Sequence, residues 1–165
     1  EEQAADTTAS DEEMVLDNKI AEYDAFLIKQ DPAFTVEELE EAMQKVMDQY
    51  AGGIGTHYQF NEKQLAMAEE KIKKLQILAK GLAAADMHEL MFIYELKERL
   101  TVCLTVIAHL RARKETRWHS FAENLDYPDK SDAWLCYVNS RKNGDQIEMI
   151  RRDLVKGGET YEHRD

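Results

Sequence analysis

Apolar residues recur every three or four positions along four stretches of the chain, and this spacing predicts four amphipathic helices. We expect the first over about 12–29, the second from 36, the third from 61 and the fourth over 86–113. The loops joining the last three are short, which favours an antiparallel three-helix bundle of the spectrin-repeat kind. The buried face of the fourth helix is expected to carry Leu90, Met91, Tyr94, Leu100, Leu104, Ile107 and Leu110.

Capping residues, a proline and several glycines predict where the helices begin and end. Three starts pair an N-cap side chain with an acidic or amide residue three positions later, namely Thr35 with Glu38, Asn61 with Gln64 and Asp86 with Glu89. Pro32 ends the first helix, because the residue before a proline is pushed out of the helical region. The glycines at 52, 53 and 55 end the second, and Gly81 ends the third.

The last fifty residues have a different pattern. The stretches 134–138 and 146–150 predict two strands joined around Asn143-Gly144, since Asn-Gly is the strongest short hairpin signal. The predicted architecture is therefore mostly α, a three-helix bundle with an extra N-terminal helix and a C-terminal β-hairpin. We divide it into a disordered acidic lead-in (1–11), an N-terminal helix and linker (12–34), the bundle (35–117), a turn-rich segment with the hairpin (118–155) and a flexible tail (156–165).

Charge and cysteine usage restrict the partners. The formal net charge of −12 repels phosphate backbones and anionic lipids, so we expect neither nucleic acid nor a membrane surface as a partner. No apolar run is long enough to span a membrane, and no signal peptide opens the chain. The two cysteines, Cys103 and Cys136, are far apart and predict buried thiols in a reducing compartment, with the cytoplasm as the expected location.

Residues that carry chemistry are few. Gly52-Gly53-Ile54-Gly55 follows a helix and lacks the preceding strand of a dinucleotide site, so a helix-exit turn is the better interpretation. The five histidines do not pair at ligand spacing with one another, which argues against a metal site. Cys103 lies among apolar helix residues and predicts an inert thiol. We therefore expect no catalytic, cofactor-binding or metal-binding residue in this chain.

One segment stands out, Arg113 to Pro128, where cations, an acid and a tryptophan follow the end of the fourth helix. A charged helix end with a turn explains it, and so does a contact surface for another domain or subunit. For the contact surface the candidate residues are Arg113, Glu115, Arg117, Trp118, His119, Asp126 and Tyr127. Arg117 is the key residue: it either lost its partner with a missing domain, or pairs locally with Glu115, Glu123 or Asp126.

This segment resembles the C-terminal domain of the succinate dehydrogenase/fumarate reductase flavoprotein superfamily. There, a long helix ends in an Arg-Lys/Glu-Glu-Ser-Arg-Gly-x-His run, followed by an Asp-aromatic-Pro turn and a Trp-Leu strand. Here the same order reads RKETRWHS and then LDYPDKSDAWLCYVNSR, and LEEAMQKVMDQYAGG is similar to the family's helix before a glycine turn. The likeness covers roughly residues 35–152.

Within the superfamily, the Thr-Arg-Trp form at 116–118 and the Tyr-Ala-Gly-Gly turn resemble the adenylylsulfate reductase alpha branch. That resemblance implies an FAD enzyme that reduces adenylylsulfate to AMP and sulfite with electrons from an iron–sulfur beta subunit. It also implies that the flavin and capping domains precede this region, so this chain alone is expected to be inactive and to hold no cofactor. The alternatives are a fumarate reductase-type flavoenzyme and a self-standing helical interaction module.

Overall fold

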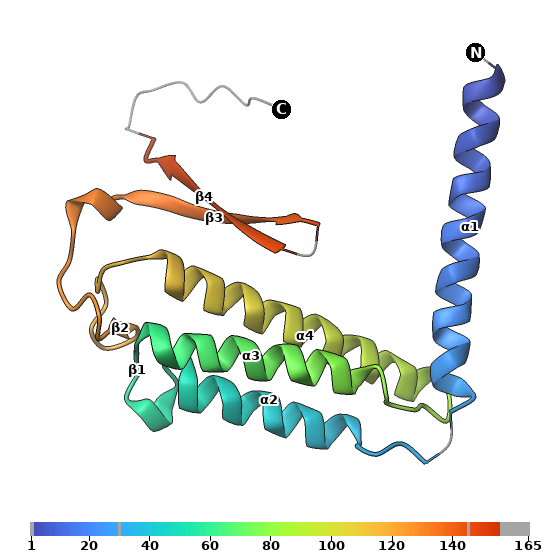
Figure 1. Ribbon diagram of the computed structural model, residues 1–165, viewed down its shortest axis with the longest axis horizontal. Helices are drawn as coiled ribbons and strands as arrows, with labels where there is room; N and C mark the ends of the chain where they lie inside the picture. Colours follow the sequence, from blue (N-terminus) through green and yellow to red (C-terminus); the bar gives the residue numbers. More distant parts are fainter. Residues whose placement is uncertain (1, 30, 145, 156–165) are drawn as a thin grey trace. The chain divides into compact units, whose positions relative to one another are not determined.

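The computed structural model of the protein describes residues 2–29, 31–144 and 146–155, with side chains from residue 12 onward (Figure 1). The main elements are α1 (Glu2–Leu27), α2 (Val36–Tyr50), α3 (Glu62–Ala79), α4 (Met87–Ala112), β3 (Cys136–Asn143) and β4 (Gln146–Asp153). Short pieces complete the list: η1 (Ile54–Thr56), β1 (Gln59–Phe60), β2 (Glu123–Asn124) and η2 (Asp132–Trp134). The predicted class, a helical bundle with a C-terminal hairpin, is confirmed. The expected flexible tail at 156–165 lies outside the described residues.

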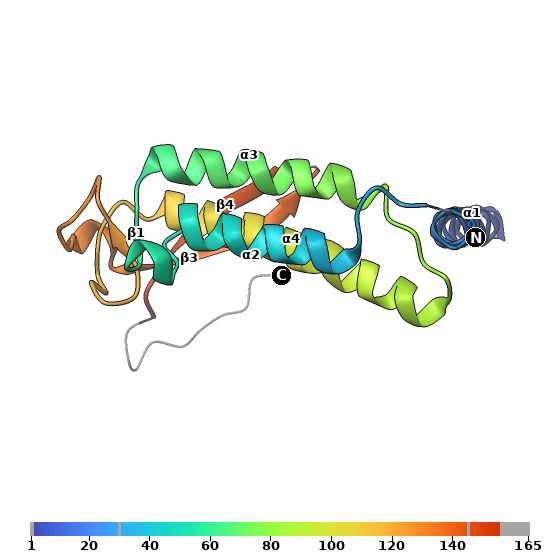
Figure 2. The same cartoon turned by 90° about the horizontal axis from the view of Figure 1, so that it is seen from below.

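The chain forms two compact units, and three helices contribute to both. The first unit contains Glu1–Ala42 and Lys74–Arg99, and the second contains Met43–Lys73 and Leu100–Asp165. The first unit thus holds the start of α2, the end of α3 and the start of α4, which requires successive helices to run antiparallel. Figure 2 shows the three helices from a second direction. None of the described helices has the length and apolarity needed to cross a membrane.

The apolar core follows helical spacing, with four corrections on α4. Leu90, Ile93, Leu96, Leu100 and Ile107 are almost fully buried there. Met91, expected inside, is exposed, and Tyr94, Leu104 and Leu110 are only half-buried. Apolar residues occur on every side of α4, so the sequence period alone could not say which ones face α2 and α3.

The first helix begins at Glu2, where we expected a disordered lead-in up to residue 11. Alanines and acidic residues near a helix N-terminus favour helix, which explains the earlier start. The other end of α1 is anchored within the first unit. Lys97 Nζ lies 2.5 Å from a Glu22 oxygen, Ala84 N–H donates to the Phe26 carbonyl, and the Tyr23 and Tyr94 rings meet edge to face.

The predicted capping residues act at three helix starts. Thr35 and Glu38 exchange reciprocal hydrogen bonds, with Glu38 accepting from the Thr35 N–H at 2.9 Å and Thr35 Oγ1 accepting from the Glu38 N–H at 3.2 Å. Asn61 accepts from the Gln64 N–H. Asp86 accepts from two backbone N–H groups of α4, while the Glu89 carboxylate reaches back to Ala85 instead of Asp86.

The hairpin in the second unit is longer than predicted. Strands β3 and β4 pair antiparallel from Cys136↔Asp153 to Asn143↔Gln146, so Asn143 belongs to the ladder and the turn begins at Gly144 with φ +59°. Trp134, expected to start the first strand, ends η2 instead. The helix α4 holds this ribbon, because Arg113 donates to the Trp134 and Cys136 carbonyls and His109 is 3.0 Å from the Ser140 hydroxyl.

Leu100→Ala should lower the free energy of unfolding by about 2–5 kcal/mol, because its side chain is 0% exposed. Val102→Ala, two residues along the same helix at 59% exposure, should change it by less than about 0.5 kcal/mol. Urea titration of both variants tests the assigned helix face. Equal losses would mean that α4 is rotated about its axis.

Candidate functional site

A buried carboxylate organises the segment that follows α4. The Glu115 side chain is fully buried, between the guanidinium groups of Arg113 and Arg117. Arg117 binds it through two nitrogens, Nε and Nη2, each 2.9 Å from a carboxylate oxygen. Arg113 Nη1 donates at 2.6 Å, and the Ser131 N–H donates at 3.0 Å. We call Glu115, Arg113, Arg117 and the Ser131 N–H the Glu115 clasp.

The clasp is electrostatically strong. Burial alone would raise the pKa of the Glu115 carboxyl, but hydrogen bonds from Arg117, from the Ser131 N–H and from Arg113 lower it to about 2 from its ordinary 4.5. In return, Glu115 raises the pKa of Arg117. Both arginines also hold backbone carbonyls, Arg117 that of Ser131 and Arg113 those of Trp134 and Cys136. One charge cluster therefore ties the end of α4 to the loop at 131 and to the start of β3.

A second buried polar group lies next to the clasp. Thr116 is 0% exposed, and its hydroxyl accepts from the Asn124 N–H at 2.9 Å and bonds the Tyr127 carbonyl at 2.8 Å. The Thr116 N–H donates to the Asp129 carbonyl. Asn124 is buried too, and its own amide oxygen accepts from the Asp126 N–H. These bonds close residues 116–129 into a loop with fixed ends.

The same loop pairs with the turn after α2. Strand β2 runs parallel to β1, with Glu123 and Leu125 N–H groups donating to the Tyr58 and Phe60 carbonyls. The β1 strand is reached through a tight turn in which His57 and Tyr58 both have positive φ. Gly53 is required there, because a Cβ at this position would lie 2.3 Å from the Asp48 Cα. His57 thus caps η1 in a left-handed conformation.

The seven predicted interface residues fall into two groups. Arg113 and Arg117 both bind Glu115, so of the two alternatives for Arg117 the structure shows the local pairing with Glu115. Asp126 is structural as well, since its carboxylate accepts from the Glu62 N–H at 2.7 Å, at the start of α3. The exposed group comprises Trp118, His119 and Tyr127.

Two of the exposed group, Trp118 and Tyr127, are among four large apolar residues that this segment exposes. Trp118 is 67% exposed and Phe121 is 74% exposed, and Leu125 and Tyr127 are exposed beside them in the chain. Residues 118 and 122 form a β-bridge, which makes Trp118 to Ala122 a tight excursion. Phe121 and Leu125 were missed as candidates, although two large apolar residues in a polar, turn-rich segment are an available signal. We call Trp118, Phe121, Leu125 and Tyr127 the aromatic loop.

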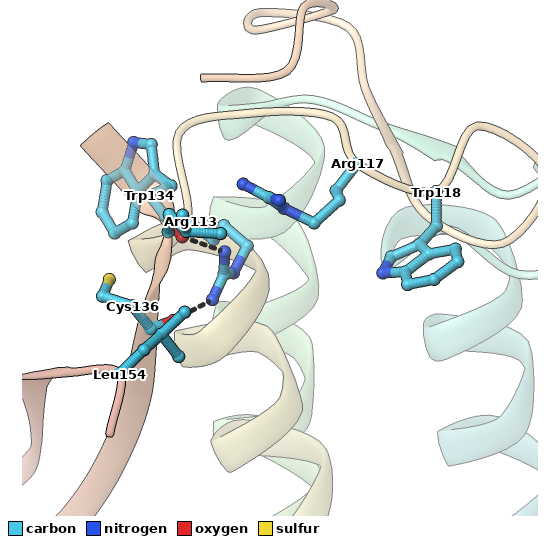
Figure 3. Close-up of a pocket in the computed structure, with 7 residues that line it drawn as sticks. Arg113, Arg117, Trp118, Trp134, Cys136 and Leu154 are labelled. Atoms are coloured by element: carbon cyan, nitrogen blue, oxygen red, sulfur yellow. Dashed lines mark hydrogen bonds between the residues drawn. The ribbon is translucent and has the colours of Figure 1, made fainter. Parts of the chain in front are cut away.

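A pocket of about 300 Å³ lies beside the clasp (Figure 3). Its walls are Arg113, Arg117, Trp118, Trp134, Leu135, Cys136 and Leu154. In Figure 3, Trp134 and Trp118 lie on opposite sides of the two arginines. The Arg151 guanidinium stacks over the Trp134 ring at 4.3 Å and also donates to the Ala133 carbonyl. Sequence reasoning missed Trp134, which it had placed in a strand.

The described residues bring no group of three or more His, Cys, Asp or Glu side chains together that could hold a metal ion. Burial raises the pKa of the Cys103 thiol, which disfavours the reactive thiolate. The geometry instead defines a helical domain that presents a braced, exposed aromatic loop beside a cationic pocket. Such a surface is typical of a domain that contacts another folded body.

The comparisons with known proteins agree with that class. The family model described as "Fumarate reductase flavoprotein C-term" matches residues 40–159, so the chain belongs to this family of flavoprotein C-terminal domains. The adenylylsulfate reductase subunit alpha of Megalodesulfovibrio gigas is 33% identical over 98 residues, which cover 59% of this chain and 15% of the relative. The predicted resemblance is confirmed.

Solved structures give the same result. An adenosine-5-phosphosulfate reductase in complex with sulfite matches at TM-score 0.72 and 35% identity, covering 78% of this chain and 20% of that one. The adenylylsulfate reductase of Archaeoglobus fulgidus matches at 0.73 and 33%, covering 81% and 21%. A quinol fumarate reductase variant of E. coli matches at 0.69 and 19%, covering 98% and 27%, which shows the shared fold. This chain spans about a fifth or less of the length of its adenylylsulfate reductase relatives.

The clasp predicts a pH dependence. Because the folded-state pKa of Glu115 lies below its ordinary value, its contribution to stability is complete above about pH 4.5 and disappears as the pH falls toward 2. The loss over this window should be about 3 kcal/mol. Glu22, whose pKa is also lowered to about 2, contributes to the loss of stability in the same pH window. The quantity to measure is therefore the difference in stability loss between the wild type and a Glu115 variant. Glu115→Gln should be destabilised at pH 7 and should lose less stability than the wild type between pH 4.5 and 2. Identical pH slopes would contradict the clasp.

Arg117→Ala should also destabilise the isolated chain, because it leaves the buried Glu115 with only Arg113 and the Ser131 N–H. The matched control is Arg141→Ala, which removes an equally bidentate arginine from the exposed Glu148 on the hairpin. Urea midpoints of the two variants decide the matter. The Arg117 variant should shift clearly and the Arg141 variant hardly at all; two equal shifts would mean that Arg117 has no special structural role.

Proposed function

We propose that the chain is the C-terminal domain of an FAD-dependent oxidoreductase that, as a longer protein, reduces adenylylsulfate to AMP and sulfite. The observation that carries this proposal is the 33–35% identity to adenylylsulfate reductases, over 59–81% of this chain. In those relatives the matched part is a small share of the whole, and in this proposal the flavin site lies in the remainder. The direct test is the activity of the longer protein with adenylylsulfate and a reduced electron donor.

In this proposal the chain's own residues support and orient and do not catalyse. The aromatic loop and its neighbour His119 contact the flavin-bearing part of the same polypeptide, while the Glu115 clasp fixes the loop beforehand. Exposed large apolar residues on a loop with fixed ends favour this role, because a preorganised surface loses little conformational entropy on docking. A bundle whose loop served only its own fold would have no reason to expose Trp118 and Phe121 together.

An iron–sulfur beta subunit and a cytoplasmic location complete the proposal. The relative's designation as a subunit alpha supports a second subunit. Cys103 and Cys136 are free thiols in the structure, as is ordinary for a protein in a reducing compartment.

The second candidate is a fumarate reductase-type flavoenzyme. It is favoured by the fold likeness to the quinol fumarate reductase, which covers 98% of this chain. The two candidates differ in substrate, so assaying the longer protein with adenylylsulfate and with fumarate separates them. Turnover of fumarate alone would replace the first proposal with the second.

The 165-residue chain should bind no flavin. The glycine-rich turn at residues 52–55 follows helix α2 instead of a strand, which is the wrong context for cradling a phosphate. Purification with excess FAD followed by a visible spectrum measures this. A stoichiometric flavin band that stays with the protein would contradict the assigned division of labour.

Replacing Trp118 and Phe121 together by alanine should leave the stability of the 165-residue chain almost unchanged, because both side chains are mostly exposed. In the longer protein the same double change should lower flavin retention and activity. The control is Ile77→Ala on α3, an exposed apolar residue of the other unit. If the double variant and the control behave alike in the longer protein, the aromatic loop does not dock.

A further inference from the structure

The pocket beside the Glu115 clasp carries a surplus of positive charge in an acidic chain. Two of its seven lining residues are arginines and none is acidic. Arg113 and Arg117 share the single carboxylate of Glu115, the Asp132 carboxylate also acts on Arg117, and the Arg151 guanidinium stacks on the Trp134 wall. The chain as a whole has a net charge of −12, so the surplus is a local feature. An anion is the ligand that this charge favours.

Hydrogen-bond geometry leaves a donor for such an anion. Arg117 uses Nε and Nη2 for Glu115 and for the Ser131 carbonyl, and the described residues supply no acceptor to its Nη1. Its side chain is 20% exposed and lines the pocket. Because the clasp fixes the guanidinium, the free nitrogen is already oriented before a ligand arrives.

Apolar side chains line the same pocket as Arg117. Trp118, Leu135 and Leu154 are exposed at the pocket. Trp134 lies across the two arginines from Trp118 and is held by cation–π contacts with Arg113 and Arg151 (Figure 3). A small inorganic anion would fill little of about 300 Å³ and would leave these apolar walls in water. A carboxylate side chain flanked by apolar residues satisfies both the charge and the walls.

We propose that this pocket binds one carboxylate side chain, with an apolar neighbour, from the flavin-bearing part of the longer polypeptide. This inference rests on the proposed function for the source of the segment. The relatives are about four times as long as this chain, and the Trp118 wall is shared with the aromatic loop, so the pocket is continuous with the proposed docking surface. The pocket then fixes the register of docking, since a buried carboxylate fits at one position only.

Intrinsic fluorescence tests the pocket directly, because the chain has two tryptophans and both line it. The probes are the isosteric peptides acetyl-Leu-Asp-Leu-amide and acetyl-Leu-Asn-Leu-amide, with sodium sulfate as an anion that has no apolar flank. The Asp peptide should change the fluorescence saturably, with an affinity at least tenfold higher than that of the Asn peptide and of sulfate. Equal affinities for the two peptides, or no saturation by either, would overturn the proposal. Binding of sulfate as tight as that of the Asp peptide would assign a small-anion site and also overturn it.

Two variants place the binding in this pocket. Trp118→Ala, an exposed wall residue, should weaken the Asp peptide several-fold with Trp134 as the remaining reporter, while Arg141→Gln on the hairpin should not. Sedimentation of the 165-residue chain tests which molecule supplies the bound segment. If the chain forms a dimer that Trp118→Ala dissociates, the segment comes from a second copy of this chain, and the assignment is overturned. Failure of the proposed function can be told apart from failure of the pocket proposal. The pocket can still prefer the Asp peptide if the longer protein reduces a substrate other than adenylylsulfate.

Discussion

The burial of one carboxylate, Glu115, between two arginines is the interaction on which the C-terminal half of the molecule depends. A carboxylate without solvent is tolerated only when its charge is matched and its oxygens are hydrogen-bonded. Here two guanidinium groups and one backbone N–H meet that demand, and the same arginines then hold three backbone carbonyls. The end of α4, the loop at Ser131 and the start of β3 therefore have one arrangement. The aromatic loop and the pocket follow from it.

Holding exposed aromatic residues on a fixed loop lowers the conformational entropy that they lose on docking. A tryptophan in water on a mobile loop would lose entropy on docking and would invite nonspecific association. On a loop closed by buried Thr116 and Asn124, the same ring is preorganised. The chain belongs to the flavoprotein C-terminal family, and it spans only a small part of its relatives' length, which supports the proposed docking of this surface onto the remainder.

Much of the fold was predictable because helix caps and hairpin turns depend on residues that are close together in the sequence. The Thr35–Glu38 box and the Asp86 cap depend on residues three apart, and the hairpin depends on adjacent turn residues. The errors came where several faces compete. Leu104 and Met91 fit a helical stripe, yet α4 is apolar on all sides, and only packing decides that Ile93 and Leu96 are inside. The partner of Arg117 was likewise open, since charges two residues apart are neighbours only if the backbone between them is not helical. Trp134 joined the site through tertiary contacts that no spacing in the sequence encodes.

Amide hydrogen exchange is the most direct test that the clasp fixes the loop. The N–H groups of Asn124, Leu125 and Ser131 donate to Thr116 Oγ1, the Phe60 carbonyl and Glu115 respectively. In the wild type they should be protected far more than ordinary loop amides. In Glu115→Gln, protection at these three positions should fall by at least tenfold more than at Ile93 and Leu96 in α4. A uniform loss across both sets, or no change at the three loop amides, would contradict the account, because the loop would then owe its conformation to the bundle and not to Glu115.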